Sequence, residues 1–210
     1  MALPGIWLIT MPEAPRGPIS AIADALADCP AGVAGVQLRA PAANDRQLVA
    51  WGRELRELTR QAGAPFLVNR RPDVAAIVEA DGVHLPEAGL SARTIASAWP
   101  RFTILGVSRH SRAGLLRASQ EGATFAFLSP LFAVPGKGEP IGLEGFEEQI
   151  AGVGLPTYAL GGIQPEHVGA LLRTGAAGVA VRRAIYDAHR PAEVMRQFVD
   201  ALDKSASREG

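Results

Sequence analysis

Short apolar runs alternate with longer amphipathic segments along most of this 210-residue chain. Eight of the runs predict strands, and most are apolar on successive residues, as parallel strands covered on both faces are. The predicted strands are Ile6–Thr10, Val33–Arg39, Pro65–Asn69, Gly82–Leu85, Thr103–Val107, Thr124–Leu128, Thr157–Leu160 and Gly178–Val181.

The segments between the strands predict helices. Asp45–Gln61 has the clearest pattern, because Leu48, Trp51, Leu55 and Leu58 fall on one helical face and charged residues on the other. The remaining predicted helices are Ile19–Asp28, Pro72–Glu79, Ser91–Ala98, Ser111–Glu121, Leu143–Ile150, Pro165–Thr174 and Arg183–Leu202.

Eight strand–helix pairs without a break in composition predict a single α/β domain, a closed (β/α)8 TIM barrel over residues 1–203. An open doubly wound sheet is the alternative, but no GxGxxG follows the first strand. Residues 204–210 (KSASREG) are polar and lack an apolar period, so we expect a disordered tail.

The composition limits the kinds of partner that the chain is expected to bind. Twenty-one basic and twenty-one acidic residues give a formal net charge of zero, so no global field favours nucleic acid or a membrane surface. The N-terminal apolar run is too short to span a bilayer. The single cysteine, Cys29, excludes an internal disulfide and a cysteine-rich metal site, and it fits a cytoplasmic protein. We therefore predict neither a nucleic-acid nor a membrane partner.

Candidate chemistry gathers where the predicted strands end, which is where a TIM barrel holds its site. Gly161 and Gly162 follow the seventh strand and open a helix, and Arg182 and Arg183 follow the eighth. Backbone N–H groups at such a helix start bind phosphate. Further polar and basic residues follow other strands: Gln37, Arg39, Asn69, Arg70, Ser108, His110 and, in a long loop, Lys137. This basic rim on a neutral chain predicts a small anionic, phosphorylated ligand.

Seven motifs in order across nearly the whole chain carry a family resemblance: QLR, VNRRPDVA, ADGVHL, LGVSRHS, SPLF…GKG…GLEGF, ALGGI and GVAVRRAIY. Together they resemble the thiamine-phosphate synthase/TenI family. The resemblance implies a (β/α)8 barrel that acts on thiazole phosphate, a small phosphorylated heterocycle, in thiamine biosynthesis, and a homo-oligomer.

The resemblance also implies roles for individual positions. Pyrimidine diphosphate would be held by the segment from Gln37 to Pro41, which includes Arg39, and by Asn69, Ser108 and Lys137. Thiazole phosphate would be held by Val134, Pro135 and Gly136, by Gly162, and by the pair Arg182 and Arg183.

The chain departs from the family pattern at positions where the synthase carries a charged residue. The aspartates that bind magnesium in the synthase are here Arg70 and Gly89, and the usual lysine after QLR is replaced at Pro41. Hard divalent cations need oxygen ligands, and arginine offers none. We therefore predict no metal site. Without magnesium, Arg39, Arg70, Arg71 and Lys137 would have to neutralise a departing diphosphate.

The TenI branch lacks those aspartates and includes thiazole tautomerases, whose catalytic histidine corresponds to His110. A single imidazole can act as both base and acid when a proton moves between carbons. The leading prediction is thus a metal-independent thiazole tautomerase without a cofactor. Two alternatives stay open: thiamine-phosphate synthase, which would need Mg²⁺, and a non-catalytic thiazole- or thiamine-phosphate-binding regulator.

Overall fold

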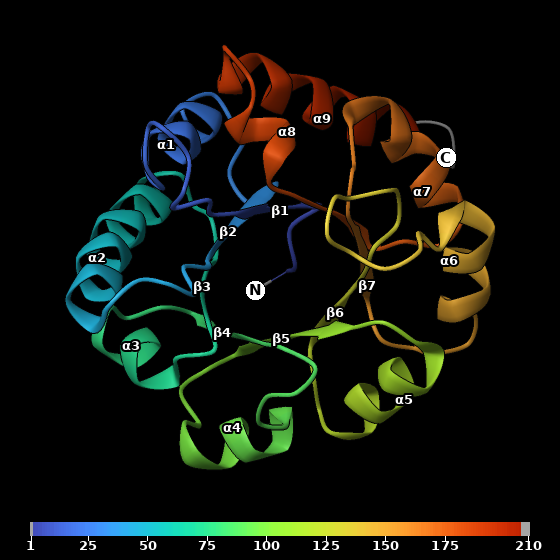
Figure 1. Ribbon diagram of the computed structural model, residues 1–210, viewed down its shortest axis with the longest axis horizontal. Coiled ribbons are helices and arrows are strands. Elements are labelled where there is room, and N and C mark those ends of the chain that lie inside the picture. The colour runs from blue at the N-terminus through green and yellow to red at the C-terminus, as the bar shows by residue number, and fades with distance from the viewer. Residues whose placement is uncertain (1, 207–210) are drawn as a thin grey trace.

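A computed structural model of the chain describes residues 2–206 and consists of a closed parallel barrel surrounded by helices (Figure 1). The strands pair in sequence order, and the last one closes on the first. They are β1 (Ile6–Ile9), β2 (Ala34–Leu38), β3 (Phe66–Asn69), β4 (Gly82–Leu85), β5 (Ile104–Arg109), β6 (Phe125–Leu128), β7 (Thr157–Leu160) and β8 (Gly178–Val181). The predicted fold class and all eight predicted strands are confirmed; three strands have the predicted bounds, and the ends of the others shift by at most two residues.

The helices form the outer ring of Figure 1. They are α1 (Ser20–Leu26), α2 (Asp45–Gln61), α3 (Pro72–Ile77), α4 (Ala92–Ala98), α5 (Arg112–Gln120), α6 (Gly142–Ile150), α7 (Val168–Arg173), α8 (Arg183–Tyr186) and α9 (Pro191–Ala206), with a 3₁₀ turn, η1 (Pro165–His167), before α7. Helix α2 has the predicted bounds, and its Asn44 N-cap forms a reciprocal capping box with Gln47. None of the described helices is long and apolar enough to cross a membrane.

One predicted helix, Arg183–Leu202, is wrong as a single element. The structure divides it into α8 and α9, separated by the segment from Asp187 to Arg190. Pro191 is the first residue of α9, a position where its missing N–H costs nothing. Helix α9 runs on to Ala206, so the first three residues of the tail predicted to be disordered are helical, while 207–210 lie outside the described residues.

Alternation along each strand gives the barrel two separate apolar regions. Outward side chains such as Val36, Leu38 and Val68 pack in one continuous core with the inward faces of the helices, including Leu55 of α2. A second cluster fills the inside of the barrel, and its members are Trp7, Ile9, Leu67, Ile104, Phe125, Phe127, Tyr158 and Ala180. The barrel is therefore packed solid below its rim.

Glycines make room for the large rings of the interior cluster. A Cβ on Gly82 would lie 1.8 Å from the carbonyl oxygen of Ile104. A Cβ on Gly106 would lie 2.4 Å from the ring of Phe125 and 2.7 Å from Nδ1 of His84. Because no side chain fits at either position, the β5 backbone lies directly against Gly82, and the rings of Phe125 and His84 lie directly against Gly106.

The amino end of the barrel is closed. Leu3 packs against the interior cluster, and the Tyr158 hydroxyl donates to the Pro4 carbonyl at 2.6 Å. In Figure 1 the N-terminal segment lies within the ring of strands. Only the carboxyl end is left to receive a ligand, which is where sequence analysis predicted the site.

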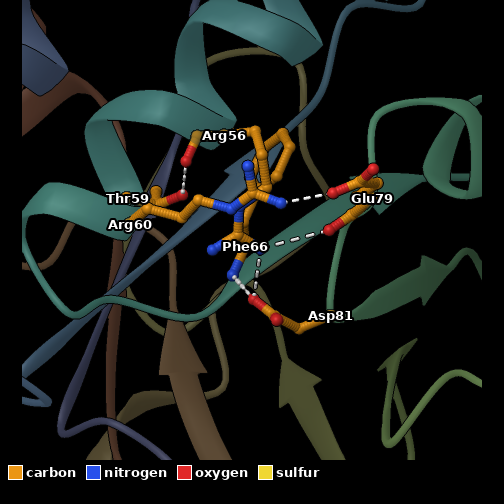
Figure 2. A network of polar contacts seen from close by, with 6 residues as sticks. All are labelled: Arg56, Thr59, Arg60, Phe66, Glu79 and Asp81. Carbon is orange, nitrogen blue, oxygen red and sulfur yellow. Dashed lines mark hydrogen bonds and ion pairs between the residues drawn. The ribbon is translucent and has the colours of Figure 1, made fainter.

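A polar network ties α2 to the starts of β3 and β4 (Figure 2). One Asp81 carboxylate oxygen accepts from Nη1 of Arg56 at 2.8 Å and from the backbone N–H of Phe66 at 2.7 Å. The carboxylate of Glu79, in the same turn, pairs with Arg60. Because these contacts lie at the amino ends of the strands, away from the mouth, we assign them to stability.

His84 is a polar exception inside the barrel. Its side chain is 1% exposed, and its ring stacks on Phe127 with centroids 4.4 Å apart. Burial, reinforced by the positive charges of Arg109 and Arg39, lowers the pKa of His84 to about 3. The folded protein therefore holds this imidazole neutral at physiological pH.

The neutral His84 makes stability depend on pH. In the unfolded chain a histidine takes up a proton below about pH 6.5, whereas the folded chain binds it only near pH 3, so the unfolded state gains protons first as the pH falls. This group should cost the wild type about 3 kcal/mol of unfolding free energy between pH 7 and pH 4. Urea unfolding of wild type and His84→Gln would measure the free energy of unfolding at both pH values. From pH 7 to pH 4 the wild type should lose that amount of stability relative to His84→Gln. A difference between the two proteins that is the same at both pH values would contradict the assignment.

Candidate functional site

The site lies at the carboxyl ends of the strands, and strand alternation decides which residues enter it. Inward positions continue upward from the interior cluster, so Gln37 on β2, Asn69 on β3 and Ser108 on β5 face the barrel axis above its aromatic filling. Gln37 is 2% exposed, and its Nε2 donates to Oδ1 of Asn69 at 3.1 Å. This hydrogen bond leaves the Asn69 amide N–H groups available to a ligand.

Three guanidinium groups gather at the mouth. Arg39 follows β2, Arg70 follows β3 and Arg182 follows β8. Burial lowers the pKa of Arg39, the positive charges of Arg182 and Arg70 lower it further, and Glu13 opposes them. The guanidinium groups are thus close enough to repel one another, and the predicted basic rim is a local cluster.

Arg39 and Arg182 are fixed by residues of the first strand and its loop. The Thr10 hydroxyl accepts from the Arg39 N–H at 2.8 Å and donates to the Arg39 carbonyl at 3.0 Å. Glu13 pairs with Arg182, whose Nε is buried and has no hydrogen-bond partner among the described residues. Arg183 is exposed as the first residue of α8, so the two predicted arginines differ in environment.

Arg70 and Arg71 point to different surroundings. Arg70 has a left-handed backbone, with φ of 68°, and its N–H donates to the His84 carbonyl at 2.9 Å. Arg71 is held by Asp45 and Asp73, whose hydrogen bonds raise its pKa. Arg71 therefore caps the α2–α3 surface rather than joining Arg39, contrary to the role we considered for it. Strained backbone of the kind seen at Arg70 recurs at functional sites.

His110 lies one residue past β5. If the alternation of the strand continues, its side chain is on the face that points toward the barrel axis. Its Nδ1 is 2.5 Å from the Ser129 carbonyl oxygen, which can only accept, so Nδ1 carries the hydrogen. In the neutral ring Nε2 is then the basic nitrogen, and it lies 3.7 Å from the Glu87 carboxylate. Carbonyl, imidazole and carboxylate together form an arrangement suited to accepting and returning a proton.

Ser108 is hydrogen-bonded to the buried histidine below it. Its Oγ lies 2.9 Å from Nε2 of His84. Sequence analysis treated Ser108 as a ligand-binding position and did not connect it to His84. Their contact follows from the pairing of β4 with β5, which alternation alone does not specify.

The predicted loop residues Val134, Pro135, Gly136 and Lys137 form an exposed turn between β6 and α6. The Lys137 N–H donates to the Val134 carbonyl at 3.1 Å, and Gly136 has φ of 74°. A proline followed by a left-handed glycine is the sequence of a type II turn. The base of the loop is fixed by hydrogen bonds from Ile141 to Pro130 and from Gly142 to Leu131, each 3.0 Å.

Gly161 and Gly162 form the predicted turn after β7. Both have positive φ, 115° and 68°, and a Cβ on Gly161 would lie 3.1 Å from the Leu131 nitrogen. The Gly161 carbonyl accepts from Phe132 at 3.1 Å. The N–H groups of Gly161 and Gly162 donate to no acceptor among the described residues. They are therefore free to bind an anion.

The residues present do not fit a magnesium ion. The two positions that carry aspartate in the synthase pattern hold Arg70 and Gly89, and the Gly89 N–H donates to the Pro86 carbonyl at 2.9 Å. Within residues 2–206, no three side chains of the metal-binding types come together. Glu87, the nearby carboxylate, faces His110.

Thr10, Glu13 and Glu87 are site residues that sequence analysis did not select. Thr10 is the last residue of the first predicted strand and Glu13 follows it, so the rule that identified the other rim residues could have found them. Glu87 appears in the sequence as a loop carboxylate, and only its distance to His110 gives it a role.

Comparison with known proteins agrees with the resemblance in the motifs. The profile of the family described as thiamine monophosphate synthase matches residues 6–185. The thiamine-phosphate synthase of Moorella thermoacetica is 36% identical over 180 residues, which cover 84% of this chain and 86% of that protein. The putative thiamine-phosphate synthase 2 of Aquifex aeolicus is 42% identical over 151 residues, which cover 71% of this chain and 81% of that protein.

A solved structure of thiamine phosphate pyrophosphorylase from Pyrococcus furiosus superposes with a TM-score of 0.86 at 28% identity, and the match covers 95% of this chain and 96% of that one. The names of all three proteins support the synthase, which sequence analysis kept as an alternative, better than the tautomerase that it placed first. The chain belongs to the thiamine monophosphate synthase family and is an enzyme of thiamine biosynthesis.

Proposed function

We propose that this protein catalyses a metal-independent tautomerisation of a thiazole phosphate. The observation that carries the proposal is the kind of side chain found at the mouth. A magnesium site would need carboxylates there, and the structure has guanidinium groups instead. The ligand would carry two anionic groups, a phosphate and a carboxylate, because three arginines face a single glutamate there.

The phosphate would lie on the N–H groups of Gly161 and Gly162 and at the start of α8, next to Arg182. Both glycines have positive φ and N–H groups without a described acceptor, which supports this position. Arg39 and Arg70 would hold the carboxylate on the opposite side of the mouth. The ligand would then lie with its ring between these groups and His110.

In the proposed reaction Nε2 of His110 removes a proton from one ring carbon, and the electron pair of that C–H bond shifts into the conjugated ring system. The resulting imidazolium returns a proton to a different carbon, so the reaction needs neither oxidant nor leaving group. Ser129 keeps Nδ1 protonated throughout, and Glu87 stabilises the transient positive charge.

The proposal predicts that His110→Ala lowers tautomerase kcat by about 100-fold or more while leaving the affinity for thiazole phosphate within about twofold. Steady-state assays with the thiazole carboxylate phosphate tautomer would measure the rate, and calorimetric titration with thiazole phosphate the affinity. His189→Ala, which removes an exposed histidine between α8 and α9, is the matched control and should behave as wild type. Unchanged kcat in His110→Ala would exclude His110 as the proton carrier.

Thiamine-phosphate synthase is the second candidate, and the names of the similar proteins favour it. That reaction joins pyrimidine diphosphate to thiazole phosphate and releases diphosphate. Without carboxylates at the two metal positions of the synthase pattern, the charge that develops on the departing diphosphate would be neutralised by Arg39, Arg70 and Lys137.

Two assays, each run with and without EDTA, separate the two candidates. One supplies the thiazole carboxylate phosphate tautomer, and the other supplies pyrimidine diphosphate together with thiazole phosphate. We expect the tautomer to be converted at the same rate in both conditions and no thiamine phosphate to form from the synthase pair. Thiamine phosphate appearing only when magnesium is present would establish the synthase and overturn the tautomerase. Tight binding of thiazole phosphate without turnover in either assay would instead indicate a regulator.

A further inference from the structure

The buried pair of His84 and Ser108 lies beneath the mouth and has no place in the chemistry described so far. His84 is enclosed by the barrel, whereas Ser108 is half-buried at the base of the mouth. The 2.9 Å hydrogen bond between Nε2 and Oγ is compatible with either group as the donor. Which of them donates decides what Ser108 can offer to a ligand.

The surroundings of Nδ1 identify the donor. Nδ1 is buried without a hydrogen-bond partner among the described residues and faces Gly106, the residue paired with His84 across β4 and β5. A hydrogen on Nδ1 would be an unsatisfied buried donor, which is costly. A lone pair there can instead meet the Gly106 Cα–H as a weak acceptor. The neutral ring therefore carries its hydrogen on Nε2.

We infer that His84 is a positioning residue: its Nε2–H donates to the Ser108 oxygen and turns the Ser108 hydroxyl into a fixed hydrogen-bond donor that faces the mouth. A serine hydroxyl has one hydrogen and two lone pairs; when one lone pair accepts from His84 below, the hydrogen is not used for His84 and is left for donation into the mouth. Such a donor selects an anionic oxygen, of a phosphate or a carboxylate, over a ligand N–H. The inference rests on the proposed function for the anionic character of the ligand.

The first test needs no substitution. Long-range nitrogen–proton NMR spectra of ¹⁵N-histidine-labelled protein near pH 7 report which ring nitrogen of His84 carries the hydrogen, with the resonances assigned through the loss of signal in His84→Gln. We expect a protonated Nε2 and an unprotonated Nδ1. A protonated Nδ1 would overturn the inference, because Ser108 would then donate downward to His84.

The second test measures ligand affinity in variants of His84. The amide N–H of a glutamine can take the place of Nε2–H, whereas a leucine has no hydrogen-bond donor. Titrations with thiazole carboxylate phosphate, which carries both anionic groups of the proposed ligand, and with inorganic phosphate would compare wild type with His84→Gln, His84→Leu, Ser108→Ala and the double variant His84→Leu/Ser108→Ala. We expect about tenfold weaker binding for Ser108→Ala and His84→Leu, no further loss in the double variant, and affinity near wild type for His84→Gln.

A purely structural role for His84 predicts a different pattern. His84→Gln and His84→Leu would then weaken binding equally, and the effect of His84→Leu would add to that of Ser108→Ala; either result would overturn the inference. Near-ultraviolet circular dichroism identifies a variant that has lost its packing, and for such a variant the NMR result on wild type decides. Wild-type protein that binds neither probe would refute the proposed function, while the NMR measurement would still decide the orientation of His84.

Discussion

Three guanidinium groups share the carboxyl end of the barrel, and their mutual repulsion raises the free energy of the mouth in the absence of an anion. The pKa of Arg39 is lowered in keeping with this repulsion: burial has the largest effect, Arg182 and Arg70 lower the pKa further, and Glu13 opposes them. An anion entering the mouth relieves the repulsion and gains charge-assisted hydrogen bonds at the same time. The fold tolerates the arrangement because the packed interior and the helical ring hold each strand end in place. In the proposed function, the positive charge that holds the anion would come from these side chains, because the two metal positions of the synthase pattern lack carboxylates here.

The layers beneath the mouth prepare its polar groups. Large rings and glycines pack together in the lower barrel, and the layer above them consists of Gln37, Asn69, His84 and Ser108. Within this layer, each side chain that faces the mouth is hydrogen-bonded from below or beside, Asn69 by Gln37 and Ser108 by His84. The same principle applies to His110, whose Nδ1 is occupied by the Ser129 carbonyl, which leaves Nε2 as the nitrogen that could exchange a proton with a ligand. Preorganisation of this kind lowers the cost of ordering the site when a ligand binds.

The sequence was sufficient for the barrel and for most of the rim, because apolar runs identify strands and strand ends identify the mouth. It failed where tertiary contacts override local pattern. The amphipathic pattern of 183–202 continues through Pro191, but the chain must turn there to place α9 along α1 and α7. Arg70 and Arg71 are adjacent in sequence and indistinguishable by type, yet the left-handed backbone of Arg70 and the carboxylates beside Arg71 separate them. The His84–Ser108 contact depends on the register of β4 against β5, which no single-strand pattern contains.

In the proposed function, guanidinium groups hold the phosphate of the thiazole without a bridging cation. Calorimetric titration of the wild-type protein with thiazole phosphate, once in EDTA and once with millimolar magnesium, measures this directly. The account predicts equal affinities in the two titrations, together with a steep weakening as monovalent salt is raised, because guanidinium groups supply the charge. Binding that requires magnesium or tightens severalfold in its presence would contradict it, since a metal would then hold the ligand in place of the arginines.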